Sequence, residues 1–133
     1  MEKAKVVLIV EDDEDIREVI AISLGAEGFD VRLASNGQQA LEEVERETPD
    51  VILLDMLMPV MSGWEFKNRY FLRPGPYAPI IVLTAAPDAA RRAAEVNAND
   101  FIAKPFDLKK VTEIVRRYAN LPHGGGTPPT PAP

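Results

Sequence analysis

The sequence predicts a doubly wound α/β protein, in which one five-stranded parallel sheet is covered by helices on both faces. Five short apolar segments alternate along the chain with five segments of helical character, and such alternation is typical of parallel strands joined by right-handed crossover helices. The longest apolar segments are continuous rather than alternating, as in strands buried on both faces. With 133 residues, 46% hydrophobic and 27% charged, the chain has the size and composition of a single soluble domain.

Five segments are predicted to form the strands. Three are uninterrupted runs of aliphatic residues, at 6–10, 51–54 and 80–83, as expected for strands buried on both faces. The segments 31–34 and 101–103 are weaker strand candidates, and we expect them nearer the edges of the sheet.

The first three helices are marked by apolar spacing and by capping residues. Apolar residues recur at helical spacing over 16–24, and Gly28 can end that helix. Asn36 can cap the second helix, which carries an apolar stripe of its own. The segment 62–65 has the composition of a capping box and is predicted to open the third helix.

The last two helices flank the fifth strand. The segment 88–96 is rich in Ala and Arg and is predicted to form a short fourth helix, which Asn97 can close in the left-handed conformation. Asp107 can cap the fifth helix, whose apolar residues share one face over 108–118.

The chain is predicted to contain one folded domain, residues 1–121, and a tail. Residues 122–133 consist of His, Thr, Gly, Pro and Ala, a composition that cannot bury a core. The tail is therefore expected to be a disordered segment or the start of a linker.

Composition excludes several classes of function. The chain has no cysteine, which excludes disulfides and thiolate chemistry, and its one histidine, His123, lies in the tail. A net charge of −6 argues against a nucleic-acid or anionic-membrane binder. No apolar run approaches the ~20 residues of a membrane span, and residues 1–5 lack the features of a signal peptide. We expect a cytoplasmic protein with no membrane partner and no direct contact with nucleic acid.

Acidic residues follow two of the predicted strands. Glu11 and Asp12 come directly after the first strand and Asp55 directly after the third, and sites in open α/β sheets form at the carboxyl ends of the strands. If these strands are neighbours, the three carboxylates converge, and their mutual repulsion calls for a cation. Oxygen ligands without His or Cys favour Mg²⁺. The following acids, at 13–15, are interpreted as partners of the helix dipole.

Two further polar residues end the fourth and fifth strands on the same rim. Thr84 supplies a hydroxyl donor and Lys104 an ammonium group, and both groups can hold phosphoryl oxygens. Each residue alone would be interpreted as an ordinary strand end or surface cation. Together with the acids they indicate a metal site, an acceptor carboxylate and two groups for a phosphoryl.

These motifs give the sequence its resemblance to the receiver domain of two-component response regulators, over residues 5 to about 120. The resemblance implies a flavodoxin-like receiver fold with strand order 2-1-3-4-5. The segments that carry it are Leu8-Ile9-Val10-Glu11-Asp12, Leu53-Leu54-Asp55-Met56-Leu57-Met58-Pro59 with Gly63, Leu83-Thr84-Ala85, and Asp100-Phe101-Ile102-Ala103-Lys104-Pro105-Phe106.

The resemblance also assigns roles to the acidic residues. Asp55 would be the phosphoacceptor, attacking a phosphohistidine on a sensor histidine kinase or a histidine phosphotransfer protein. Asp12, Asp55 and the backbone carbonyl of Leu57 would bind Mg²⁺ directly, and Glu11 would act through water. The domain would be regulatory rather than an enzyme, and would catalyse only its own phosphorylation and dephosphorylation.

The remaining matched residues would report the phosphorylated state. Thr84 and Lys104 would hold the phosphoryl oxygens, and Phe101 would be an aromatic switch whose inward turn follows Thr84. A downstream protein or output domain would be contacted through the face built from the fourth helix, the fifth strand and the fifth helix. The resemblance further implies a cis peptide bond between Lys104 and Pro105.

Three features depart from the family pattern. Phe101 replaces the commoner tyrosine, Asn97 stands where glycine is usual, and the interval from Thr84 to Lys104 is about two residues short. The last departure indicates a trimmed fourth helix or preceding loop and puts the usual output surface in doubt.

Two alternatives compete with the receiver. A Mg²⁺-dependent aspartyl phosphohydrolase usually needs a second acid two residues after its nucleophile, where this chain has Leu57. A receiver-like binding module that takes no phosphoryl would have no need of the full set of polar residues. That set is Glu11, Asp12, Asp55, Thr84 and Lys104.

Overall fold

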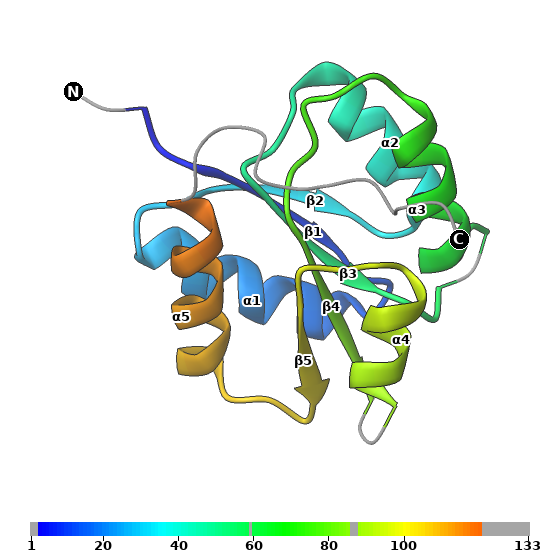
Figure 1. The fold of residues 1–133 in the computed structure, drawn as a ribbon. Helices are drawn as coiled ribbons and strands as arrows, with labels where there is room; N and C mark the ends of the chain where they lie inside the picture. Colours follow the sequence, from blue (N-terminus) through cyan, green and yellow to red (C-terminus); the bar gives the residue numbers. More distant parts are fainter. Residues whose placement is uncertain (1–2, 59, 86–87, 121–133) are drawn as a thin grey trace.

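The computed structural model describes residues 3–58, 60–85 and 88–120, and within them five strands alternate with five helices (Figure 1). The strands are β1 (Val6–Val10), β2 (Asp30–Ala34), β3 (Val51–Asp55), β4 (Ile80–Ala85) and β5 (Asp100–Lys104). The helices are α1 (Glu14–Ala26), α2 (Gly37–Arg46), α3 (Gly63–Leu72), α4 (Ala89–Glu95) and α5 (Leu108–Ala119). Each predicted element is present, with boundaries shifted by at most a few residues.

The strands form one parallel sheet in the order β2-β1-β3-β4-β5. The predicted fold is therefore confirmed, and the two weaker strand candidates, β2 and β5, lie at the edges of the sheet. β1 and β3 are buried along their whole length, which explains their uninterrupted aliphatic sequence. β1 pairs with β2 on one side and with β3 on the other. The order of the strands therefore reverses its direction between β1 and β3, which is the topological switch point of the sheet.

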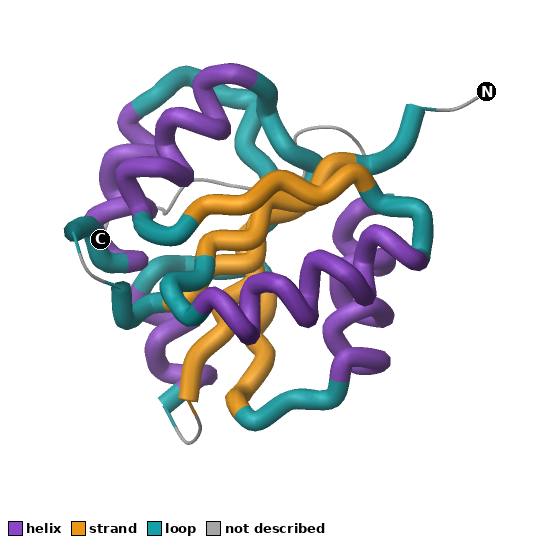
Figure 2. The backbone as a smooth tube through the Cα atoms, turned by 180° about the vertical axis from the view of Figure 1, so that it is seen from behind, coloured by secondary structure: helices purple, strands orange, loops and turns teal. Residues whose placement is uncertain are grey.

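The helices cover the sheet in two layers (Figure 2). α1 and α5 pack on the face that carries Val7, Ile9 and Leu53. α2, α3 and α4 pack on the opposite face against residues such as Leu8 and Ile52. Because alternate strand residues point to opposite faces, these two core clusters also define the face to which each strand-end residue belongs.

The predicted residues cap or close all five helices. Asn36, Ser62 and Asp107 each accept a hydrogen bond from a backbone N–H in the first turn of α2, α3 and α5. Gly28 has a φ of 94° just beyond the end of α1, and Asn97 has a φ of 55° beyond the end of α4. Both residues therefore close their helices in the left-handed conformation, as predicted.

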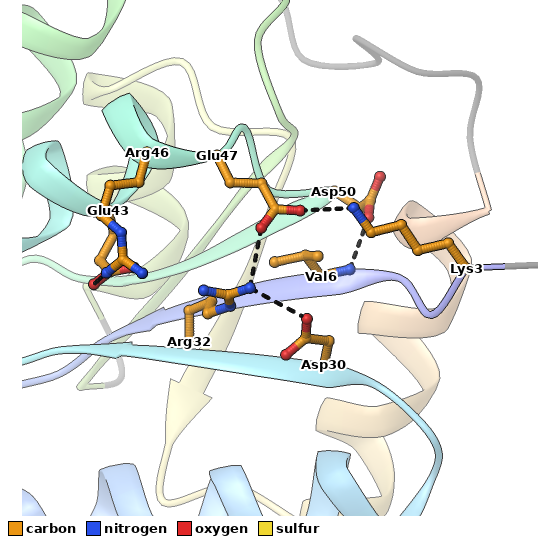
Figure 3. Close-up of polar contacts among 8 residues, drawn as sticks. All are labelled: Lys3, Val6, Asp30, Arg32, Glu43, Arg46, Glu47 and Asp50. Atoms are coloured by element: carbon orange, nitrogen blue, oxygen red, sulfur yellow. Dashed lines mark hydrogen bonds and ion pairs between the residues drawn. The ribbon is translucent and has the colours of Figure 1, made fainter.

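The amino-terminal ends of the strands are joined by ion pairs (Figure 3). Arg32 bridges Glu47 at 3.0 Å and Asp30 at 3.4 Å, and Lys3 pairs with the other oxygen of Glu47 at 3.0 Å. The Val6 N–H donates to an Asp50 carboxylate oxygen at 2.7 Å. These contacts hold together the amino-terminal ends of β1, β2 and β3. The carboxyl edge of the sheet, at the other end of the strands, carries the predicted site residues Glu11, Asp12 and Asp55.

Two predictions concern the limits of the domain. The predicted tail, 122–133, lies outside the described residues, so its state stays a prediction. None of the helices in residues 3–58, 60–85 and 88–120 combines the length and the apolar character that a membrane span requires.

Candidate functional site

The predicted site residues gather at the carboxyl edge of the sheet. Glu11 directly follows β1, and Asp55 and Lys104 are the last residues of β3 and β5. Their strand positions belong to the face covered by α1 and α5, because they follow the alternation of Ile9, Leu53 and Ile102. Parallel pairing and this common face bring together three side chains that are far apart in sequence.

Three carboxyl groups form the floor of the site. Glu11, Asp12 and Asp55 each offer a carboxylate oxygen, and these atoms lie within 4.8 Å of one another. Glu11 is fully buried and Asp55 is 4% exposed, whereas Asp12 is open to solvent. Such a half-open cluster of oxygen ligands suits a hard cation that retains part of its hydration shell, as Mg²⁺ does.

One atom of the cluster supports this fit independently of the spacing. The Glu11 Oε2 atom is buried and has no hydrogen-bond partner among the residues that the structure describes. A buried carboxylate oxygen normally has a partner, because an unsatisfied one is unfavourable. A cation, or a water bound to one, at the mouth of the cluster would satisfy it.

Lys104 is the cation that the chain itself supplies to the cluster. Its Nζ lies 2.6 Å from Glu11 Oε1 and 3.8 Å from Asp55 Oδ2. The Lys104 side chain is 23% exposed, so its ammonium can be reached from outside. Lys104 therefore neutralises part of the acidic charge and faces the position where a group bound to Asp55 would lie.

The crowded acids raise the proton affinity of the Asp55 carboxyl. Burial, together with the neighbouring Glu11 carboxylate, raises the pKa of Asp55 to about 7, although Lys104 acts in the opposite direction. Burial and the proximity of Asp55 also raise the pKa of Asp12. A bound divalent cation would favour the ionised form of both groups, which is the form that can act as ligand or nucleophile.

Backbone contacts fix the two loops that carry the acids. The Leu57 N–H donates to Asp55 Oδ1 at 3.2 Å, so the loop after β3 holds the Asp55 carboxyl in place. The Leu57 carbonyl as a metal ligand stays a prediction. Asp13 Oδ1 accepts from the Ile16 N–H as the cap of α1, which confirms its interpretation as a helix partner.

Arg17 is a supporting residue that the sequence analysis missed. Its guanidinium donates to the Glu11 carbonyl oxygen at 2.8 Å and so positions the loop between β1 and α1. Its place in α1, about one helical turn after the cap, gives it the reach to do so. No motif of the sequence indicated this contact, because its acceptor is a backbone carbonyl oxygen.

Thr84 and Phe101 belong to the other face of the sheet. Thr84 continues the alternation of Ile80 and Val82, which pack toward α4, and Phe101 is paired in register with Val82. Thr84 is 1% exposed and Phe101 is 40% exposed. The predicted role of Phe101 as a switch residue stays a prediction.

The peptide bond between Lys104, the last residue of β5, and Pro105 is cis. This confirms the expectation drawn from the family resemblance. α4 has only seven residues, in keeping with the short interval between Thr84 and Lys104.

The family of the chain is shown by its relatives. Residues 7–116 match the family described as the response regulator receiver domain. The response regulator MprA of Mycobacterium leprae (strain TN) is 38% identical over 112 residues, which cover 83% of this chain and 49% of that protein. The probable transcriptional regulator ycf27 of Porphyridium aerugineum is 34% identical, over 94% of this chain and 56% of that protein. The chain thus spans about half the length of the curated relatives it matches.

Solved structures agree with this assignment. The receiver domain of the sensor histidine kinase PA1611 from Pseudomonas aeruginosa PAO1, described with a magnesium ion coordinated in its active site cleft, has a TM-score of 0.81 and 32% identity. The match covers 90% of this chain and all of that one. The chemotaxis response regulator CheY4 of Vibrio cholerae has a TM-score of 0.79 and 29% identity, over 87% of this chain and 99% of that one. The chain belongs to the response regulator receiver domain family.

Proposed function

We propose that the chain is a Mg²⁺-dependent phosphoacceptor of a two-component system and that Asp55 receives the phosphoryl group. The observation that carries the proposal is the environment of Asp55. Its carboxyl is almost fully buried, lies within 4.8 Å of Glu11 and Asp12, and has the Lys104 ammonium at 3.8 Å. A regulatory receiver family and an acceptor carboxylate beside a cation site point to the same chemistry.

The proposed reaction is an in-line phosphoryl transfer. An Asp55 carboxylate oxygen bonds to phosphorus while the phosphorus–nitrogen bond of a donor phosphohistidine breaks, and the electron pair passes to the imidazole, which a proton from water keeps neutral. Little proton transfer within the site is required, so positioning and charge neutralisation dominate. This suits a site whose described residues include no histidine and in which Leu57 stands two residues after the acceptor.

The surrounding residues have distinct roles in this proposal. Asp12, Asp55 and the Leu57 carbonyl would hold Mg²⁺, with Glu11 acting through water. The bound cation supplies neutralisation of the roughly −1.5 to −2 charges of the phosphoryl group. Lys104 exchanges part of its contact with Glu11 for the phosphoryl oxygens, and the Thr84 hydroxyl donates to them.

The proposed partners follow from the family. A sensor histidine kinase or histidine phosphotransfer protein supplies the phosphoryl group, and a downstream protein or output domain is contacted through α4, β5 and α5. The basic residues of α5 are either part of that contact or an ordinary solvated face. A cytoplasmic location and the lack of direct nucleic-acid contact by this domain stay predictions, the latter supported by the net charge of −6.

The proposal is tested by incubating the chain with Mg²⁺ and a small phosphodonor such as acetyl phosphate. Wild type should gain the mass of one phosphoryl group on Asp55, and Asp55→Asn should gain none while keeping its fold. Asp12→Asn should take up phosphoryl more slowly and need more Mg²⁺. Asp13→Asn is the matched control, because Asn can also cap α1 and uptake should match wild type.

Two outcomes would contradict the proposal. Full uptake by Asp55→Asn, mapped to another residue, would exclude Asp55 as acceptor. Repeated turnover of a generic phosphate ester would favour the phosphohydrolase, and no uptake by wild type from any donor in Mg²⁺ would favour the unphosphorylated binding module.

A further inference from the structure

A small polar cluster joins α4 to the beginning of α3. The Trp64 Nε1–H donates to Glu95 Oε2 at 2.8 Å, and the Arg92 guanidinium lies over the Trp64 ring, 5.4 Å from its centroid. Trp64 is the only tryptophan of the chain. We name Trp64, Arg92 and Glu95 the α3–α4 clasp.

α4 has few other means of holding its position. It is seven residues long, and helices of this length are unstable unless they are packed against the rest of the protein. Within these seven residues only Ala89 and Ala93 are buried, and they bury far less apolar area than Leu or Ile would. Val96, the residue that follows the helix, adds one larger buried side chain at its end. The Asp88 side chain makes no cap hydrogen bond and pairs with Arg91 and Arg92 instead. The clasp therefore gives α4 contact with a large side chain, Trp64, and a hydrogen bond from Trp64 to the charged carboxylate of Glu95.

The other end of the clasp is connected to the phosphoacceptor loop. Trp64 directly follows Gly63, whose N–H donates to the Met56 carbonyl at 3.1 Å. A Cβ on Gly63 would lie 2.6 Å from Met56 Sδ, so the two residues are in closest contact. Met56 is itself fully buried and follows Asp55. Only a short run of packed residues therefore separates Asp55 from Trp64.

We propose that the α3–α4 clasp transmits the position of the loop after Asp55 to α4. A displacement at the first turn of α3 shifts Trp64, which loosens its contacts with Glu95 and Arg92 and releases α4. This route is separate from the one through Thr84 and Phe101. It rests on the proposed function only where phosphorylation of Asp55 is the event that displaces the loop.

The first test needs no phosphoryl group and measures backbone hydrogen exchange in α4. Trp64→Phe keeps an aromatic ring but removes the N–H donor, and should raise exchange in α4 about five- to tenfold, as expected for the loss of one hydrogen bond. Exchange in β1 and β3 should not change. Glu42→Ala, at an exposed glutamate of α2, is the control and should leave α4 unaffected.

The second test perturbs α3 at a distance from α4. Ser62→Ala removes the α3 cap and should also speed exchange in α4, and in the Trp64→Phe background it should add nothing further. Asn36→Ala removes the equivalent cap of α2 and should have no effect on α4. Unchanged α4 exchange in Trp64→Phe, or full additivity of Ser62→Ala with it, would overturn the proposal.

The third test connects the clasp to phosphorylation. Beryllofluoride with Mg²⁺, used as a phosphoryl mimic, should change Trp64 fluorescence and speed α4 exchange in wild type, and should change α4 much less in Trp64→Phe. If the mimic raises the Tm but leaves Trp64 emission and α4 exchange unaltered, the coupling is refuted. If it does not bind at all, the phosphoacceptor proposal fails, and the two mutational tests still decide the clasp.

Discussion

The Lys104 ammonium lies 2.6 Å from Glu11 but 3.8 Å from Asp55. Lys104 therefore pairs mainly with Glu11, the residue that is proposed to act through water. The negative charge of Asp55 is only partly neutralised by it. Because Asp55 is also buried, its ionised form is unfavourable until a further cation arrives. At the scale of single residues, the site favours a proton or a metal ion on Asp55.

This arrangement predicts how the stability of the metal-free chain depends on pH. The pKa of Asp55 is raised to about 7 from its ordinary value of 3.8, so the folded chain binds more protons than the unfolded chain between these values. The free energy of unfolding therefore falls as pH rises through that window, by at most ~1.4 kcal/mol per pH unit from this group. The free energy of unfolding is measured by urea titration at several pH values. The difference between wild type and Asp55→Asn isolates the contribution of Asp55.

Magnesium provides the internal check of this prediction. Mg²⁺ should stabilise wild type more above pH about 7 than at acidic pH, because proton and metal compete for the same carboxyl. In Asp55→Asn both the pH slope and most of the Mg²⁺ effect should disappear. A wild-type stability that instead rises over this window, relative to Asp55→Asn, would show that Asp55 is ionised without metal.

Val60 lies in the loop after Asp55 with a φ of 68°, a conformation that is strained for a β-branched residue. Its side chain is 80% exposed, so little packing compensates. Asn tolerates this conformation, and Val60→Asn should raise the free energy of unfolding by ~0.5–1 kcal/mol in a urea titration. Val19→Asn, at an exposed valine within α1, is the control and should be near neutral. Equal effects of the two substitutions would disprove the strain.

At the scale of the elements, helices and strands could be predicted from the sequence where capping residues and the pattern of buried residues indicate the same element. The aliphatic runs of β1, β3 and β4 and the caps Asn36 and Ser62 were predictable because each satisfies a backbone requirement within a few residues. The contact of Trp64 with Glu95 could not be predicted, because it depends on how two helices lie against each other. The contact of Arg17 with Glu11 was missed for a different reason, because its acceptor is a backbone carbonyl, which carries no residue signature.

Two helical glycines allow an experimental test of how far local propensity and tertiary packing each decide stability. A Cβ on Gly63, at the start of α3, would lie 2.6 Å from Met56 Sδ and 2.9 Å from its Cα, and Gly63→Ala should destabilise the fold by ~1–3 kcal/mol. A Cβ on Gly25, within α1, would have no atom of the surrounding structure within 4 Å, and Gly25→Ala should stabilise by ~0.5–1 kcal/mol. Chemical denaturation measures both. Opposite signs are required, since a shared sign would mean that helix propensity alone decides.

At the scale of the whole molecule, the two ends of the sheet have different roles. The amino-terminal ends of β1, β2 and β3 are fastened by the ion pairs of Lys3, Arg32 and Glu47 (Figure 3). The carboxyl edge instead carries a buried carboxylate oxygen with no partner among the described residues, a strained residue and a seven-residue helix. If the domain signals by a change of its surface, as we propose, that change is expected at the carboxyl edge, where fewer contacts hold the structure in place.

Phe101 is where that change should become visible on the surface. The residue is 40% exposed on the α4 side of β5. Burying a phenylalanine side chain is worth roughly 1.5–3 kcal/mol, which is enough to shift a two-state equilibrium appreciably. Beryllofluoride with Mg²⁺ should draw Thr84 toward Asp55 and favour the inward ring. Relaxation of the ring protons by a soluble paramagnetic agent should therefore fall for Phe101 and stay constant for Phe29, which packs on the opposite face. Equal relaxation of Phe101 with and without the bound mimic would mean that the ring does not switch, and that α4 alone carries the signal.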